Sequence, residues 1–261
     1  MGYDFFKDIT DLQQKHGKSG MSVSNSLQTN ITLITDELAK HLAEYRFLVG
    51  VSLDGPATIH NHYRRDAKGK GTHARVMAGI EILKKYDVDY NILVLVNKNN
   101  VTKAGEIYRY LKDMGVVYHQ YIECVEFSDN GDLMPYAVNG KEWGDFLCEL
   151  YDEWIKEDTR KISIRLFDTI LAMMVDGAVT SCTFGTNCCQ YFVVEHNGDV
   201  YPCDFFVEKD LILGNVASGS WEEFLSSETY LEFGRRKSQY NAKCAECEYL
   251  RFCAGCCQKN R

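Results

Sequence analysis

Cysteine is the residue type with the clearest chemical potential in this chain of 261 residues. It contains eleven cysteines, and nine of them lie within its last eighty residues: Cys182, Cys188, Cys189, Cys203, Cys244, Cys247, Cys253, Cys256 and Cys257. Four of these follow the spacing C-x2-C-x5-C-x3-C, in which successive sulfur atoms turn toward one centre. Thiols of a chain without an export signal stay reduced, so the pattern predicts metal ligation rather than disulfides.

The number of thiols predicts two metal centres. Seven or eight thiolates exceed the needs of one tetrahedral site, and no histidine stands at ligand spacing in this half, which leaves Zn²⁺ or iron–sulfur clusters as candidates. A hairpin signal, His196-Asn197-Gly198-Asp199, folds Cys203 back toward Cys188. We expect one centre at Cys182, Cys188, Cys203 and a late cysteine, and another at Cys244, Cys247, Cys253 and a partner. The alternative, buried free thiols, requires nine unrelated core cysteines.

The composition indicates which kinds of binding partner this protein has. There are 29 Lys and Arg against 37 Asp and Glu, a net charge of −8 without a block of like charge, which disfavours nucleic acid. The longest apolar runs, such as 92–96, are far shorter than the roughly 20 residues of a membrane span. The start of the chain lacks the basic and apolar regions of a signal peptide. We therefore expect a cytoplasmic protein that contacts neither nucleic acid nor membrane.

The elements of the first half alternate between helices and strands. The patterns predict helices at 4–16, 35–45, 72–86, 101–114, 141–157 and 164–176, and strands at 21–27, 47–53, 90–96 and 116–122. We expect a left-handed C-cap at Gly17 and an N-cap at Thr72. Such alternation predicts a parallel sheet with right-handed crossovers, whose sites gather at the carboxyl ends of the strands. The loops after Leu27, Leu53 and Val96 are therefore candidate site loops.

Several runs of sequence together resemble a known family. They are Ser26-Leu27-Gln28-Thr29-Asn30, Val51-Ser52-Leu53-Asp54-Gly55-Pro56 with His60 and Arg64 behind it, Ser163-Ile164-Arg165-Leu166-Phe167-Asp168, 188–195, 197–206, 213–216 and the closing cysteines. Throughout its length the chain resembles the anaerobic sulfatase-maturating enzymes, which are radical S-adenosylmethionine enzymes with a C-terminal SPASM domain.

The resemblance implies an α/β fold, a partial (β/α)6 radical S-adenosylmethionine barrel followed by a cysteine-rich SPASM domain. Its parts would be a barrel at 1–140, a helical linker at 141–181 and the SPASM domain at 182–261. The implied activity is oxidation of a Cys or Ser side chain in a sulfatase to Cα-formylglycine. The implied cofactors are S-adenosylmethionine and [4Fe–4S] clusters, two of them auxiliary. The implied partners are the sulfatase polypeptide and an electron donor such as flavodoxin or ferredoxin.

The same resemblance assigns roles to single residues. Cys182, Cys188, Cys203 and Cys257 would hold the first auxiliary cluster, and Cys244, Cys247 and Cys253 three corners of the second. Asp204 would be the base that deprotonates the substrate, since neighbouring thiolates and desolvation raise the pKa of a carboxylate toward the working pH. Its alternative is a solvated turn residue after Pro202.

Three further residues are candidates for binding S-adenosylmethionine: Ser52, Asp54 and Gln28. The alternatives are an ST-turn or Asx-turn before Pro56 for the first two and a barrel-lining side chain for Gln28. Arg165 and Asp168, one helical turn apart, fit a plain i,i+3 pair as well as a site role.

The sequence also departs from the family. It contains no C-x3-C-x2-C signature and no GGEP segment, so we expect a chain truncated at its N-terminus, in which the first helix has lost its preceding strand and which alone forms no radical. The eighth SPASM cysteine is also absent, so Cys256 is either a substitute ligand or a spare thiol, and Cys189 poses the same question. Two other functions stay open: modification of another peptide, and a non-catalytic zinc module that binds a peptide or protein.

Overall fold

The computed structural model describes residues 2–261, and its contacts divide the chain into two compact units. The first unit extends to Leu166 and the second runs from Phe167 to Arg261. Each unit has its own sheet. The finer division into barrel, helical linker and SPASM domain stays a prediction.

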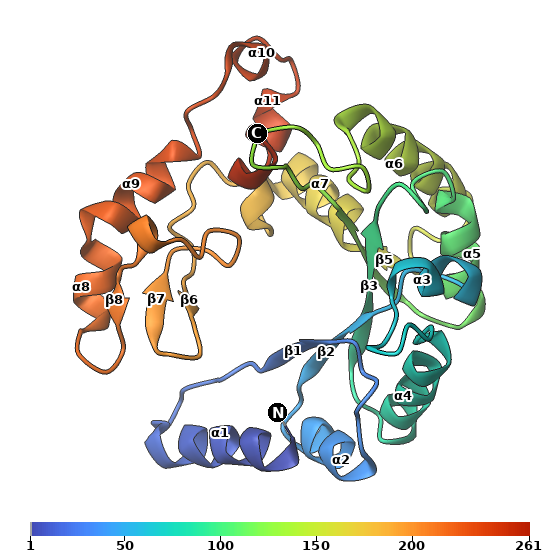
Figure 1. The fold of residues 1–261 in the computed structure, drawn as a ribbon, viewed down its shortest axis with the longest axis horizontal. Helices are drawn as coiled ribbons and strands as arrows, with labels where there is room; N and C mark the ends of the chain where they lie inside the picture. The colour runs from blue at the N-terminus through green and yellow to red at the C-terminus, as the bar shows by residue number, and fades with distance from the viewer. Residues whose placement is uncertain (1) are drawn as a thin grey trace. The chain divides into compact units, whose positions relative to one another are not determined.

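A parallel sheet forms the centre of the first unit (Figure 1). Its five strands follow one another in chain order, and every neighbouring pair is parallel. The strands are β1 (Ser26–Thr29), β2 (Leu48–Ser52), β3 (Tyr90–Val96), β4 (Tyr118–Glu123) and β5 (Ser163–Ile164). The parallel sheet predicted from the alternation of elements is thereby confirmed, with β5 as an addition.

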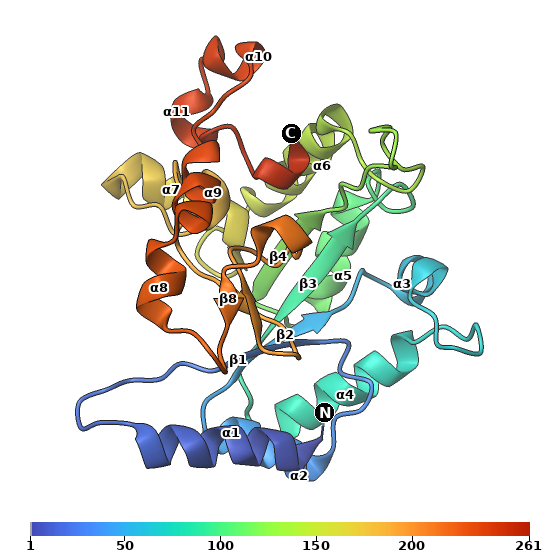
Figure 2. The same ribbon diagram turned by 60° about the vertical axis from the view of Figure 1, so that its left-hand side comes forward.

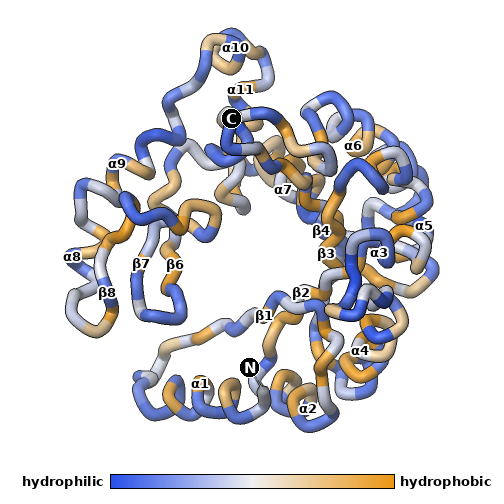
Figure 3. Tube along the Cα trace, in the orientation of Figure 1, coloured by the Kyte–Doolittle hydropathy of each residue, from blue (hydrophilic) through white to orange (hydrophobic). Residues whose placement is uncertain are grey.

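Helices connect these strands, and α2, α4, α5 and α6 cover one face of the sheet in Figures 1 and 2. The helices of this unit are α1 (Tyr3–His16), α2 (Asp36–Glu44), α3 (Ala57–Tyr63), α4 (His73–Lys85), α5 (Ala104–Asp113) and α6 (Gly140–Trp154). The strands β2 and β3 are mainly apolar, as their orange segments in Figure 3 show. Val49, Val51, Ile92 and Val94 are fully buried, because strands of such a sheet are covered on their faces.

Two local expectations for this unit were wrong, and a third was confirmed only in part. The first strand was expected at 21–27 but begins at Ser26, because only that segment pairs with β2, while Met21 and Val23 are exposed. Gln28 therefore lies within β1 and not in the loop after it. Gly17 adopts an extended backbone instead of the left-handed one. Thr72 is the N-cap residue of α4, as expected, but its hydroxyl accepts no helix N–H and donates instead to the Arg64 carbonyl oxygen at 3.0 Å.

The second unit consists of short elements. A three-stranded antiparallel sheet joins β6 (Val193–Val194), β7 (Asp199–Tyr201) and β8 (Gly214–Asn215). The helices are α7 (Arg165–Asp176), which starts at the boundary, and then η1 (Cys182–Phe184), η2 (Lys209–Leu211), α8 (Trp221–Ser226), α9 (Glu228–Arg236), α10 (Ala242–Ala245), α11 (Leu250–Cys253) and η3 (Gln258–Asn260). The predicted hairpin is confirmed: Glu195 N–H donates to the Asp199 carbonyl oxygen, and Gly198 has a φ of 87°. No helix of residues 2–261 is both long and apolar enough to cross a membrane.

Candidate metal centre

The carboxyl end of β2 in the first unit carries two of the candidate residues. Ser52 and Asp54 are both buried. The Asp54 carboxylate accepts two hydrogen bonds from the Arg64 guanidinium, at 2.6 and 3.0 Å, and a third from the Leu95 N–H at 3.0 Å. These contacts tie the loop after β2 to β3 and to the loop after α3. Asp54 thus positions this edge of the sheet, and both of its carboxylate oxygens accept hydrogen bonds.

His60 completes the same network as a neutral imidazole. Its Nδ1 accepts from the Asp54 N–H at 3.3 Å, so the proton is on Nε2, which donates to the Thr72 hydroxyl at 3.0 Å. Burial is the main cause that lowers the pKa of His60 to about 4. Gln28, on the neighbouring strand β1, is exposed. The loop after Val96 is held by an internal hydrogen bond, in which the Asn97 N–H donates to the Asn100 side-chain oxygen at 2.7 Å.

Cysteines gather around a tyrosine in the second unit. The Tyr191 hydroxyl lies 3.7 Å from Cys182 Sγ and 3.8 Å from Cys203 Sγ, so it stands between the two thiols. Cys203 is buried and packs with Leu211 and Phe233. Desolvation raises the pKa of the Cys203 thiol to about 11, and the neighbouring Asp204 carboxylate adds to the shift. That thiol donates to Asp204 Oδ1 at 3.4 Å, while the Asp204 side chain itself is exposed.

Adjacent Cys188 and Cys189 point to different surroundings. Cys188 packs against the cluster formed by Cys203, Leu211 and Phe233. The Cys189 thiol instead donates to the Tyr230 carbonyl oxygen at 3.3 Å and lies over Gly234, where a Cβ atom would come within 2.1 Å of its sulfur. The Cys189 thiol is therefore engaged by the backbone of α9. Cys188 is the thiol of this pair that lies toward Cys203.

Cys257 belongs to the same group of thiols. Burial raises its pKa, and the negative charges of Cys182 and Cys188 raise it further, whereas Lys237 lowers it. Lys237, the C-cap of α9, is fully buried. Burial lowers the pKa of its ammonium group, and so does Arg261, while the thiols of Cys188, Cys256 and Cys257 act in the opposite direction. Sequence reasoning missed this lysine, since a lone Lys carries no signal that it is buried.

Three further candidate ligands lie in the last helices of the unit. Cys244 is on α10, Cys247 follows it, and Cys253 ends α11, which packs against η1 and therefore against the segment of Cys182. The Cys247 N–H donates to the Cys244 carbonyl oxygen at 3.2 Å, a local turn that keeps these two residues close. Cys256, in a left-handed conformation with φ 58°, donates its N–H to the Cys253 carbonyl oxygen.

The donor set of the first group suits an iron–sulfur cluster. Among residues 2–261, no three His, Cys, Asp or Glu side chains are arranged to hold a single metal ion. A cluster is wider than one ion, so its ligands stand farther apart. Cys182, Cys188, Cys203 and Cys257 provide four thiols. Burial makes the ionisation of Cys203 and Cys257 unfavourable, and repulsion by Asp204 adds to the effect on Cys203, as repulsion by Cys182 and Cys188 does on Cys257. Positively charged iron relieves that repulsion, so these residues fit such a group. For Cys244, Cys247 and Cys253 the fit rests on their residue type and spacing.

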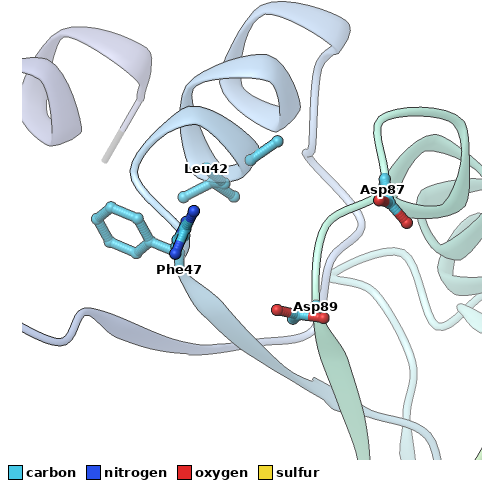
Figure 4. Close-up of a pocket in the computed structure, with 6 residues that line it drawn as sticks. Leu42, Phe47, Asp87 and Asp89 are labelled. Carbon is cyan, nitrogen blue, oxygen red and sulfur yellow. The ribbon is translucent and has the colours of Figure 1, made fainter.

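A cavity of about 330 Å³ lies elsewhere, at the amino ends of β2 and β3 (Figure 4). Leu42, Phe47, Asp87 and Asp89 line it, together with Ala43 and Arg46. Sites of parallel α/β sheets form at the opposite, carboxyl ends of the strands. We therefore interpret this cavity as a gap at the junctions between helices and strands and not as a catalytic or binding site.

Comparisons with known proteins agree with this arrangement. Residues 1–111 match the radical SAM superfamily, and residues 182–248 match the SPASM iron–sulfur cluster-binding domain. The chain is 36% identical over 264 residues to a cysteine-type anaerobic sulfatase-maturating enzyme of Clostridium perfringens, an alignment that covers all of this chain and 71% of the relative. The chain belongs to the anaerobic sulfatase-maturating enzyme family.

Other relatives of the family are similarly close. A serine-type anaerobic sulfatase-maturating enzyme of Bacteroides thetaiotaomicron is 37% identical over 98% of this chain and 66% of its own length, so the chain spans about two thirds of these relatives. The solved structure of native anSMEcpe with bound AdoMet and the Cp18Cys peptide superimposes with a TM-score of 0.92 at 36% identity, over 99% of this chain and 72% of that one. Streptococcus suis SuiB with bound S-adenosylmethionine shares the fold, with a TM-score of 0.62 at 15% identity.

The family membership confirms the predicted kinship and fold, in which a radical SAM domain precedes a SPASM domain. The SPASM match begins at Cys182 and includes every candidate ligand up to Cys247. Cys253, Cys256 and Cys257 follow the matched segment.

Proposed function

We propose that this chain provides the substrate-oxidising part of an enzyme that converts a Cys or Ser side chain of a sulfatase to Cα-formylglycine. The observation that carries the proposal is the group of four thiols, Cys182, Cys188, Cys203 and Cys257, with the Asp204 carboxylate directly beside it. Relatives named cysteine-type and serine-type sulfatase-maturating enzymes support both substrate side chains.

The four thiols would hold the first auxiliary cluster, and Cys244, Cys247 and Cys253 three corners of the second. When bound, the clusters accept single electrons, and S-adenosylmethionine supplies the radical that takes a hydrogen atom from the substrate Cβ. We further propose that a flavodoxin or ferredoxin delivers the electron that starts each turnover.

Asp204 performs the proton transfer in this scheme. Its exposed carboxylate is accessible to a peptide side chain, and its backbone is fixed by the buried Cys203 before it. A carboxylate within hydrogen-bond reach of a substrate side chain can act as a general base. Asp204 thus removes the proton of the substrate thiol or hydroxyl while the hydrogen atom leaves Cβ and one electron leaves the substrate, a two-electron oxidation in all. A Ser substrate gives the aldehyde directly, whereas a Cys substrate gives a thioaldehyde, which water hydrolyses to the aldehyde with release of hydrogen sulfide.

Ser52, Asp54 and Gln28 would serve S-adenosylmethionine from the first unit. Ser52 and Gln28 lie on neighbouring strands, where Gln28 pairs with Gly50 and Thr29 with Val51. Because Arg64 and the Leu95 N–H already engage the Asp54 carboxylate, Asp54 would act by fixing the loop after β2.

The test is product analysis on a sulfatase peptide, with an enzyme in which a C-x3-C-x2-C segment precedes residue 1. We expect aldehyde on the target Cys or Ser by mass spectrometry, and a rate at least ~100-fold lower in Asp204→Asn, as is typical for loss of a general base. Glu208→Gln removes a nearby exposed carboxylate and is the matched control with an unchanged rate. A thioether product without aldehyde, or full activity of Asp204→Asn, would contradict the proposal.

A further inference from the structure

Lys237 is a fully buried lysine at the end of α9 in the second unit. Its Nζ donates to the Thr183 carbonyl oxygen at 2.9 Å and also to the Cys256 carbonyl oxygen. Thr183 follows Cys182, and Cys256 precedes Cys257, so one ammonium group joins two segments that are more than seventy residues apart in the sequence. Each segment carries a candidate ligand of the first cluster.

Neighbouring contacts show that α9 is the support for both segments. The Cys188 N–H donates to the Gly234 carbonyl oxygen at 3.3 Å, and the Ser238 hydroxyl donates to the Thr186 carbonyl oxygen. On the other side, the Gln258 side chain donates to the Phe233 carbonyl oxygen at 3.1 Å. Lys237 is the only one of these links whose side chain reaches both segments.

The charge of Lys237 lacks a carboxylate partner among the residues that the structure describes. The groups that face it are two carbonyl oxygens, the Arg261 guanidinium and the thiols of Cys188, Cys256 and Cys257. A buried cation without a nearby anion is strongly disfavoured, and the Arg261 charge adds to the cost. Thiolates that hold a cluster provide the missing negative charge.

We propose that Lys237 is a positioning residue for the first auxiliary cluster: it fastens the Cys182 and Cys257 segments to α9 and places a positive charge beside the cluster thiolates. The inference rests on the cluster site of the proposed function. A nearby positive charge stabilises the more negative, reduced cluster, so Lys237 makes its reduction potential less negative.

The experiment compares anaerobically reconstituted chains of the wild type, Lys237→Met, Lys237→Gln and Lys237→Arg. Two quantities are measured on each: the affinity for iron, by competition with a chelator, and the midpoint potential, by a titration monitored by electron paramagnetic resonance. The signal of this centre is identified as the one that Cys203→Ala abolishes. Lys209→Met removes an exposed lysine of the same unit and is the control.

We expect Lys237→Met to bind iron about 10- to 100-fold more weakly, as is typical when support of a metal ligand is lost. Lys237→Gln keeps a hydrogen-bond donor but loses the charge, so its potential shifts to a more negative value. Lys237→Arg keeps the charge, so its iron affinity and midpoint potential stay closer to those of the wild type. Lys209→Met has the same values as the wild type.

Two failures are distinguishable. If Lys237→Met does not fold, the midpoint potential of the cluster in Lys237→Gln tests the role of Lys237. Wild-type iron affinity and an unchanged midpoint potential in Lys237→Gln would overturn the role of Lys237 while the cluster site stands. A wild-type chain that takes up no iron would instead overturn the cluster site itself.

Discussion

The two units of this protein are stabilised in different ways. The first buries a continuous apolar core, in which Leu42, Val49, Val51, Ile80 and Ile92 are fully excluded from solvent. The second has strands of two or three residues and fewer buried apolar side chains, among them Val200, Phe224 and the group of Cys203, Leu211 and Phe233. Apolar burial on this scale rarely stabilises a small unit alone, and metals or disulfides commonly make up the difference. The comparison therefore predicts that the first unit depends on its apolar core and the second on the iron–sulfur clusters that its cysteines would hold.

We expect the largest difference between the two units when iron is removed. Binding of a metal by a site that forms only on folding contributes directly to folding, so chelation should open the second unit and spare the first. By hydrogen exchange with mass spectrometry, we expect amide protection in 182–257 to fall by about 100-fold or more on iron removal. Strands β2 to β4 should keep their amide protection. An equal loss of protection in both units would contradict the claim that only the second unit depends on iron.

Acid should act mainly on the first unit. Burial lowers the pKa values of His60 and His119 to about 4, below the 6.5 of an unfolded histidine. The unfolded state therefore binds more protons between these values, so stability is complete above pH 6.5 and falls as the pH drops toward 4. The full loss is about 3 kcal/mol for each histidine.

Urea unfolding of the first unit at a series of pH values measures this effect. His119→Gln should remove roughly half of the slope between pH 6.5 and 4. His196→Gln changes a histidine of the second unit whose side chain is 91% exposed, so it should leave the slope unchanged. A slope that His119→Gln does not alter would contradict the assignment to buried imidazoles.

The smallest expected effects come from a matched pair of helix caps. Asn139 caps α6 in the first unit and Ser220 caps α8 in the second, each in a complete capping box with a glutamate. Asn139→Ala and Ser220→Ala should each cost about 1 kcal/mol, because each leaves helix N–H groups unpaired. Asn139→Ala should lower the unfolding midpoint of the first unit, and Ser220→Ala only the protection of α8 amides. A shift of the first unit's midpoint in Ser220→Ala would show that the units are coupled.

Sequence alone predicted the elements whose signals are local. The apolar run at 90–96 matches β3, and the helix expected at 35–45 matches α2, whose first turn carries Asp36 and Glu37. Tertiary partners decided the rest. The apolar residues Met21 and Val23 have no strand beside them, so β1 starts at Ser26. Thr72 has the side chain of an N-cap, but Arg64 and His60 engage its hydroxyl.

The same limit applies to the site. Residue type and spacing identified the cysteines as candidate ligands, and the spacing to Cys203 favoured Cys188 without assigning Cys189 another role. The difference between the two cysteines depends on α9, since Gly234 allows the Cys189 thiol to approach the helix backbone. Lys237 escaped prediction for a similar reason: its burial results from the docking of two distant loops on one helix end.

The adjacent pair Cys188 and Cys189 offers the most direct test of the central claim, which is that Cys188 and not its neighbour holds an iron–sulfur cluster. The measurement is iron, zinc and sulfide content with ⁵⁷Fe Mössbauer spectra, on anaerobically reconstituted wild type, Cys188→Ala and Cys189→Ala. We predict that Cys188→Ala loses one cluster, about four iron atoms, and that Cys189→Ala keeps the wild-type content. Equal iron in both variants, or zinc in place of iron in the wild type, would contradict the account.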